Sequence, residues 1–177
     1  SYSLNPDIEV LAPWRIWEYS SREDLVNYCK IHQIDIDASP DEPLYSTDEN
    51  LLHTSYEGGV LEDPSVEAPE SVWQKTVNIM DTPDRKTEVT IDFRNGDPVA
   101  LDGQPLKSSE ILSTLNDMAG KNGIGRLDLV ENRFTGMKSR GCYETPGGAL
   151  LLKAHRAMES ITLDGHAAHL KDELMPK

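Results

Sequence analysis

The clearest alternation of apolar and polar side chains occurs in residues 87–93, TEVTIDF. A period of two places the apolar side chains on one face of an extended strand. The pair Asn95-Gly96 follows, and it favours the tight turn of a β-hairpin because both residues tolerate positive φ angles. Residues 99–101 return as the second strand. The pattern therefore predicts an antiparallel hairpin.

The N-terminal part of the chain predicts a strand followed by a helix. Residues 8–15, IEVLAPWR, alternate before a turn at Pro13, which is typical of a short buried strand. Apolar side chains recur at helical spacing in residues 22–33, and Ser21 is placed to cap that helix. The Asp- and Pro-rich residues 34–43 are typical of a linker. This order indicates the last unit of an α/β domain.

A second helix is predicted in residues 108–123, SSEILSTLNDMAGKNG. Ser108 or Ser109 is its expected cap, and Gly120 or Gly123 marks its expected end. Its apolar side chains recur every three or four residues and predict a buried stripe. The members of that stripe are Ile111, Leu112, Leu115 and Met118.

A third helix is predicted over residues 148–163, after Thr145 as cap and Pro146 at the first helical position. Its expected buried side chains are Leu150, Leu151, Ala154 and Met158. Residues 50–59 and 126–134 have strand-like patterns. The chain as a whole therefore predicts an α+β fold, with a mostly antiparallel sheet and packed helices.

The 177-residue chain carries 17 basic and 31 acidic side chains, a formal net charge of −14 at pH 7. Phosphate contacts need clustered Lys and Arg, so this balance opposes binding to nucleic acid or an anionic membrane. No apolar run approaches the ~20 residues of a membrane span. Two cysteines, Cys29 and Cys142, form no CxxC motif, which favours a reducing compartment. We therefore expect a cytoplasmic protein without nucleic acid or membrane partners.

No common nucleotide or metal motif is present. The sequence contains neither GxxxxGK(S/T) nor GxGxxG after a strand. Gly147-Gly148 lies near a helix start, where N–H groups can meet an anion, but such glycines more often serve only the turn. His166 and His169 have helical spacing without a convincing further zinc ligand. Cys142 lacks the His partner of a thiol nucleophile. We therefore expect no metal site and no catalytic side chain.

Two polar segments remain as candidate binding elements. Residues 45–55, YSTDENLLHTS, carry the hydroxyls of Ser46 and Ser55 on either side of a strand-like run. Residues 130–148, VENRFTGMKSRGCYETPGG, are broken by glycines and carry Glu131, Arg133, Lys138, Arg140, Tyr143 and Glu144. A carboxylate, hydroxyls and a phenol suit a small zwitterion. A solvated loop whose glycines serve tight turns has the same composition, and spacing leaves both interpretations open.

Four stretches carry a resemblance to a known family: APWR, YSTDENLLHTSYEGGVLEDP, GRLDLVENRFTGMKSRGCYETPGG and LLLKAHRAMESITLD. Over residues 8–164 the chain closely resembles argininosuccinate synthase. The resemblance implies an ATP-dependent ligase of arginine biosynthesis that condenses citrulline and aspartate to argininosuccinate. In that reaction the citrulline ureido oxygen attacks the α-phosphorus of ATP, and pyrophosphate leaves. The aspartate amine then displaces AMP from the citrullyl-adenylate. ATP is a substrate there, accompanied by Mg²⁺.

The family's citrulline contacts in this part of the chain fall on Ser46, Ser55, Glu131 and Tyr143, by the motifs YSTDENLLHTS, VENRF and YETPGG. A carboxylate suits an ammonium group, and hydroxyls can fix polar ends. The resemblance therefore implies that these four side chains position the substrate and do not transfer protons. It assigns no cofactor-binding or metal-binding residue to this chain.

Departures from the family pattern are equally informative. Family members are more than twice as long, begin with an SGGxDTS pyrophosphate loop and form tetramers through a far C-terminal helix. The 177 residues contain no SGGxDTS. We therefore expect residues 1–35 to end the nucleotide-binding α/β domain, and residues 36–177 to be an incomplete synthetase domain without that helix. The chain alone is expected to be inactive. The alternatives are a non-catalytic amino-acid-binding or interaction module that retained the citrulline pocket, and an acidic α+β domain without a pocket.

Overall fold

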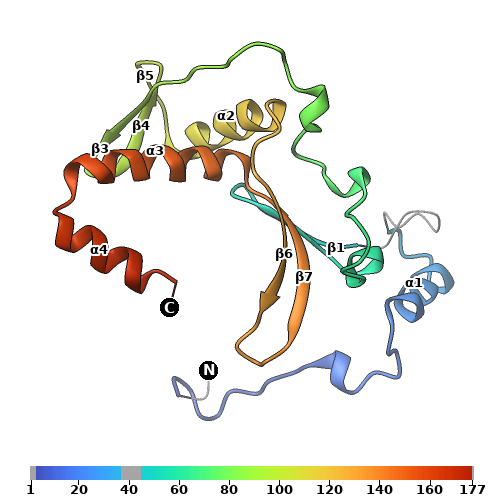
Figure 1. Ribbon diagram of the computed structural model, residues 1–177. Coiled ribbons are helices and arrows are strands. Elements are labelled where there is room, and N and C mark those ends of the chain that lie inside the picture. The colour runs from blue at the N-terminus through green and yellow to red at the C-terminus, as the bar shows by residue number, and fades with distance from the viewer. Residues whose placement is uncertain (1–2, 37–44, 177) are drawn as a thin grey trace. The chain divides into compact units, whose positions relative to one another are not determined.

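The computed structural model describes residues 3–36 and 45–176 (Figure 1). The chain divides into two compact units, Ser1–Glu42 and Pro43–Lys177, and each is described by itself. Helices and antiparallel strands are both present, which confirms the predicted α+β class. The predicted linker falls largely on residues 37–43, which lie outside the described residues.

The N-terminal unit contains a 3₁₀ turn, η1 (Pro13–Arg15), and the helix α1 (Arg22–Ile31). Ser21 caps α1 as predicted. Its hydroxyl accepts a hydrogen bond from Asp24 N at 3.1 Å, and the Asp24 carboxylate accepts one from Ser21 N at 3.0 Å. This capping box satisfies two N–H groups that the first helical turn leaves without partners.

The strand predicted in residues 8–15 is wrong. No strand forms in residues 3–36, and the large apolar side chains of the predicted strand are exposed, with Val10 at 57% and Leu11 at 76%. Alternation creates an apolar face, but a strand also needs partners for its backbone N–H and C=O groups. None of the described residues pairs with this segment in a sheet.

The C-terminal unit contains two antiparallel sheets. In the four-stranded sheet the order is β1-β2-β7-β6, and in the three-stranded sheet it is β3-β4-β5. The strands are β1 (Ser46–Glu49), β2 (Thr54–Glu57), β3 (Ile91–Arg94), β4 (Asp97–Leu101), β5 (Gln104–Pro105), β6 (Arg126–Asn132) and β7 (Lys138–Glu144). Adjacent β6 and β7 lie side by side along their whole length (Figure 1).

Two tight turns shape the three-stranded sheet. The β3–β4 turn forms at Asn95-Gly96, whose φ angles are 53° and 91°, as predicted. The strand bounds differ from the prediction: β3 starts only at Ile91, whereas β4 starts at Asp97, two residues earlier than predicted, and ends at Leu101 as predicted. A second turn at Asp102-Gly103, with φ angles of 48° and 76°, leads into β5. Positive φ at both central residues gives the backbone twist that closes a two-residue hairpin.

The helices of this unit are α2 (Ser108–Lys121), α3 (Pro146–Thr162) and α4 (Gly165–Leu174). Helices α2 and α3 pack together, and α2 also contacts β4 (Figure 1). Leu101, Ile111 and Leu115 form the buried centre of this layer. Of the helices in the described ranges, none has the length and apolar composition that crossing a bilayer requires.

The predicted serine cap of α2 is wrong. Lys107 is the N-cap, and its backbone N–H donates to the Glu110 carboxylate at 2.9 Å, so Ser108 already lies inside the helix. Gly123 has a φ of 65° just beyond the helix, in agreement with the predicted end. Helix α3 follows Thr145 with Pro146 in its first turn, as predicted, although the Thr145 side chain makes no capping bond.

Residues 130–148 are not an irregular loop. They comprise the end of β6, a turn, the whole of β7 and the start of α3. Gly136 takes the positive φ that this turn requires, at 83°. Similarly, the strand predicted in residues 50–59 begins only at Thr54. The preceding turn is closed by Asn50, whose side-chain oxygen accepts hydrogen bonds from Leu52 N at 2.8 Å and His53 N at 3.1 Å.

Candidate functional site

The register of the four-stranded sheet places all four predicted site residues on one face. Ser55 lies directly opposite Tyr143, and Ser46 lies opposite Glu57, two residues beyond Ser55. Glu131 lies opposite Ser139, an even number of positions before Tyr143. Side chains directly opposite, or separated by an even number along a strand, point to the same side of a sheet. We call this side of the sheet the open face.

The open face differs from the other side in burial. Residues at the alternate positions of β2 and β7 are fully buried: Tyr56 and Cys142 pack with Leu61 and Val72 in a small core. By contrast, Ser46 is exposed, while Ser55, Glu131 and Tyr143 are only half-buried. The predicted site residues are therefore accessible on a sheet whose opposite side is anchored in the core.

Tyr143 and Glu131 contact each other directly. The Tyr143 hydroxyl donates a hydrogen bond to Glu131 Oε1, across β7 and β6. Gly141 makes room for this contact, because a Cβ added there would lie 2.4 Å from Tyr143 Oη and 2.7 Å from Cζ. The tyrosine ring therefore lies over the glycine, along the strand, toward Glu131. Burial and then the bond to Glu131 raise the pKa of Tyr143 to about 12.

Arg133, just beyond β6, extends this polar cluster. Its Nη2 lies 3.3 Å from both carboxylate oxygens of Glu57 and 3.2 Å from Ser139 Oγ. Its Nε lies 3.6 Å from Glu131 Oε2. Two carboxylates on the open face are thus joined by one guanidinium, which keeps like charges from facing each other unpaired.

The two serines are less closely associated with this cluster. Ser46 lines a cavity of about 400 Å³ together with Glu57, Lys138 and Ser139. Ser55 shares the open face through its pairing with Tyr143. The structure thus brings Glu131 and Tyr143 into contact and places Ser46 and Ser55 nearby on the same surface.

A larger cavity of about 580 Å³ lies at the β1–β2 turn. It is lined by His53, Lys75 and Asn116 among others, and the His53 ring stacks near Tyr143 with ring centroids 6.5 Å apart. This cavity therefore adjoins the edge of the open face at Tyr143.

Glu144, which the sequence placed among the candidate binding groups, is instead a buried hub of hydrogen bonds. Its carboxylate is fully buried and accepts hydrogen bonds from Tyr56 Oη at 2.6 Å and Gln74 N at 2.8 Å. It also accepts from Thr76 N at 2.8 Å, Thr76 Oγ1 at 2.6 Å and Lys75 N at 3.0 Å. A buried carboxylate needs this many donors to replace its lost hydration. The period-two pattern was the available signal, since residue 144 shares the buried side with Tyr56 and Cys142.

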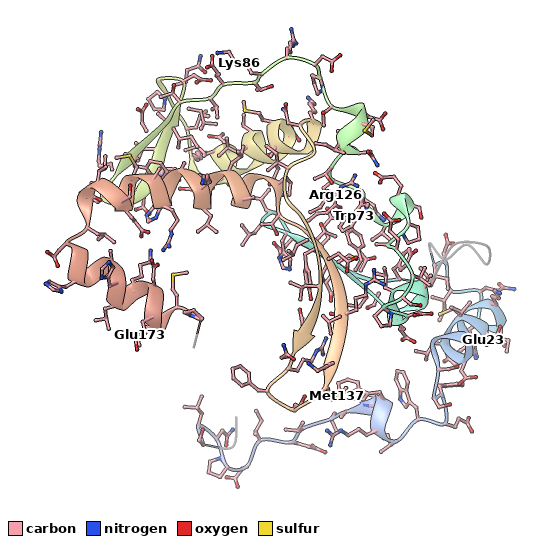
Figure 2. The ribbon with its side chains drawn as sticks, in the orientation of Figure 1. Glu23, Trp73, Lys86, Arg126, Met137 and Glu173 are labelled. Atoms are coloured by element: carbon pink, nitrogen blue, oxygen red, sulfur yellow. The ribbon has the colours of Figure 1, made fainter. Side chains whose placement is uncertain are left out.

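Arg126 of β6 binds the segment that also donates to Glu144, residues 70–76. Its guanidinium contacts Glu70 with two bonds, at 3.0 and 2.7 Å, and donates to Thr76 Oγ1 and Thr76 O at 2.7 Å. It also lies over the Trp73 ring, 5.0 Å from the centroid, and the two side chains are labelled in Figure 2. The segment that covers the buried side of the sheet is therefore held by Glu144 and Arg126 together.

Arg140, one of the candidate binding groups named from the sequence, makes its contacts within the fold. Its side chain is only 9% exposed, and its guanidinium forms a two-bond ion pair with Asp128, at 2.9 and 2.8 Å. It also donates to the carbonyls of Asp63 and Val66, at 2.9 and 2.8 Å. Arg140 therefore supports the fold and does not await an anion. The Arg140 bond holds the pKa of the Asp128 carboxyl below its usual range.

Metal binding and thiol reactivity depend on the placement of the His, Cys, Asp and Glu side chains among the described residues and on the burial of Cys142. Within residues 3–36 and 45–176, no group of three or more His, Cys, Asp or Glu side chains is placed to hold a metal ion. Cys142 is buried, and burial raises the pKa of its thiol to about 11, so a thiolate is disfavoured at neutral pH.

Comparison with known proteins identifies the family. Residues 45–177 match the Arginosuccinate synthase C-terminal domain. Over the whole chain, the sequence is 60% identical to an argininosuccinate synthase from Mesorhizobium japonicum and 55% identical to one from Hahella chejuensis, and it covers 44% of each of those proteins. It is 58% identical over 99% of the chain to the enzyme of Nitratiruptor sp., and covers 43% of it. The chain thus spans less than half the length of these relatives. It belongs to the argininosuccinate synthase family.

Proposed function

We propose that this chain is part of an ATP-dependent ligase that condenses citrulline and aspartate to argininosuccinate. Family membership over the whole chain supports this proposal. The observation that carries it at the level of the site is the single open face shared by Ser46, Ser55, Glu131 and Tyr143. Residues separated by about 100 positions in sequence share this face.

The proposed chemistry has two steps. The ureido oxygen of citrulline attacks the α-phosphorus of ATP, so that an O–P bond forms and pyrophosphate leaves. The aspartate amine then attacks the ureido carbon of the citrullyl-adenylate and forms a C–N bond. The C–O bond breaks, and AMP leaves with its electron pair. The ureido carbon is a poor electrophile until its oxygen belongs to a phosphate leaving group. Holding citrulline in one orientation lowers the entropic cost of both steps.

The residues of this chain would orient citrulline. The Glu131 carboxylate suits the α-ammonium group, because a charge-assisted hydrogen bond is short and strong. Tyr143, with a pKa of about 12, keeps its proton at neutral pH and acts as a hydrogen-bond donor and acceptor, not as a base. The hydroxyls of Ser46 and Ser55 would fix other polar atoms of the ligand.

ATP and Mg²⁺ are assigned to no residue of this chain. Mg²⁺ would neutralise charge on the polyphosphate when bound. We propose that residues 1–35 end the nucleotide-binding domain and that residues 36–177 belong to the synthetase domain. We further propose a cytoplasmic, tetrameric parent enzyme, as membership of this family implies. The 177-residue chain alone is predicted not to catalyse citrulline-dependent exchange between ATP and pyrophosphate.

Calorimetric titration of the chain with citrulline tests the site. Saturable heat is expected for the wild type, and a loss of that heat is expected for Glu131→Ala. The matched control is Glu88→Ala, which removes an exposed carboxylate outside the four-stranded sheet and should leave binding unchanged. Equal binding by wild type and Glu131→Ala would contradict the proposed role of the open face. Citrulline-dependent exchange by the isolated chain would contradict its predicted inactivity.

A further inference from the structure

Arg133 occupies a position between two acidic side chains that the predicted substrate contacts do not explain. It reaches Glu57 of β2 and Ser139 of β7 through Nη2, and it approaches Glu131 of β6 through Nε. Its backbone is fixed by the β6–β7 turn, because Arg133 N donates to Met137 O at 3.0 Å. A planar guanidinium with several fixed donors can span such partners, whereas an ammonium group cannot.

These contacts determine how Glu131 is held. Glu131 Oε1 accepts the hydrogen bond from Tyr143, and Oε2 faces the Arg133 guanidinium. The carboxylate is therefore oriented from two sides. Without the guanidinium, Glu57 and Glu131 would be two negative groups on one face, and only Tyr143 would fix the orientation of Glu131. The side chains are between one third and one half exposed, so orientation matters more here than the strength of each ion pair.

The charge of the cluster also fits the proposed ligand. Glu57 and Glu131 contribute two negative charges, and Arg133 contributes one positive charge. One negative charge is left, which complements a single ammonium group. A cluster of this charge favours an amino acid over a similar molecule without the amino group. The second ligand would cover the carboxylate of Glu131 without supplying a cation to pair with it.

We propose that Arg133 is a positioning residue of the citrulline site, which holds Glu131 against Tyr143 and is itself anchored by Glu57 and Ser139. The substrate named here rests on the proposed function. The positioning of Glu131 does not, because it is a property of the unliganded chain and is measurable without citrulline.

The first test follows the ring signals of Tyr143 by NMR in the chain labelled at tyrosine, with Tyr143→Phe used for assignment. The double variant Glu57→Gln/Arg133→Gln removes the clamp and preserves the net charge of the cluster. Its Tyr143 signals should shift toward those of Glu131→Gln, while the signals of Tyr56, on the buried side, stay in place. Arg94→Gln, which makes the same arginine-to-glutamine change at an exposed residue of β3, should move the signals of neither tyrosine. Unshifted Tyr143 signals in the double variant would overturn the proposal.

The second test compares the binding of citrulline with that of 5-ureidopentanoate, which lacks the α-amino group. The preference of the wild type for citrulline should fall about tenfold in the double variant, the loss expected for one oriented charge-assisted contact. Arg133→Lys should recover only part of it, because one ammonium cannot span both carboxylates. An unchanged preference in the double variant, or full recovery by lysine, would overturn the positioning role. A wild type that binds no citrulline would overturn the proposed function instead, and the NMR shift alone would then decide the role of Arg133.

Discussion

Replacing Glu144 by Gln tests how the buried side supports the open face. The two side chains have the same shape, so the change removes charge and exchanges one oxygen for an NH₂ group. Oε2 of Glu144 accepts from Tyr56 Oη and Gln74 N, and Oε1 accepts from Thr76 N and Thr76 Oγ1. Whichever way the amide is turned, its NH₂ group therefore faces at least two donors. Glutamine at residue 144 is expected to be strongly destabilising.

The magnitude follows from those lost bonds. Hydrogen bonds to a charged group contribute roughly 1.5–3 kcal/mol each, so two of them give about 3–6 kcal/mol. A domain of ordinary stability has only about 5–15 kcal/mol in total. With a urea m-value of ~2 kcal/mol/M, the unfolding midpoint should fall by roughly 2 M. Glu131→Gln is the matched control on the other side of the same hairpin, and its half-exposed carboxylate should cost less than ~1 kcal/mol.

Urea unfolding of both variants, followed by circular dichroism, decides the matter. A midpoint for Glu144→Gln no lower than that of Glu131→Gln would refute the role assigned to the buried hub. If Glu144→Gln does not fold, Tyr56→Phe provides the measurement, since it deletes a single donor at 2.6 Å and leaves the remaining bonds in place. That variant should be less stable than the wild type by about 1–3 kcal/mol, and an unchanged midpoint would count against the hub.

Three further predictions concern the open face, the pH dependence of the folding stability and the buried thiol. Gly141→Ala should displace the ring of Tyr143 and weaken citrulline binding about tenfold. The urea midpoint should change little, because the atoms that a Cβ would meet belong to the Tyr143 side chain. Unchanged citrulline binding would contradict this prediction. The folded-state pKa of Asp128 is lowered by Arg140, so its stabilisation is present above the unfolded value of about 3.9 and is lost as pH falls through the folded value. Asp128→Asn should therefore be less stable than the wild type at pH 7 and should approach it in acid, whereas a constant difference across pH would contradict the ion pair. Cys142, with a raised pKa of about 11, should react with iodoacetamide only as the chain unfolds, and rapid alkylation of the folded chain would show that it is accessible.

Local signals in the sequence predicted several elements correctly. Asn95-Gly96 forms the expected hairpin turn, Ser21 caps α1, and Pro146 lies in the first turn of α3. Each depends on a side chain and backbone within a few residues of each other. Caps and turns of this kind can be predicted from the sequence, because few tertiary contacts compete with these local hydrogen bonds and backbone preferences.

Strand β7 could not be recognised from its own residues. In KSRGCYE the three charged side chains, those of Lys138, Arg140 and Glu144, fall on one face with Cys142 as its only apolar member, and the central residue is a glycine. These features are typical of a solvated loop and not of a half-buried strand. Its buried charges are tolerated only because distant groups satisfy them: Asp128 pairs with Arg140, and the backbone near Thr76 donates to Glu144. The opposite error occurred in residues 8–15, where alternation was present without a partner strand.

The candidate site combines both kinds of information. The family resemblance predicted Ser46, Ser55, Glu131 and Tyr143 as substrate contacts, and that assignment stays a prediction. Their common face could not be derived from the sequence, because it depends on the register between strands far apart in the chain. Arg133 stood among the polar groups of its segment, but only its contacts suggest what it does.

A residue-resolved NMR titration with citrulline tests whether the open face binds the substrate. Saturable shifts are expected for Ser55, Glu131 and Tyr143 on the open face, while the signals of Tyr56 and Cys142 on the buried side remain unchanged. Saturable shifts confined to other parts of the chain, with no response at Glu131 and Tyr143, would contradict the claim that this face of the sheet binds citrulline.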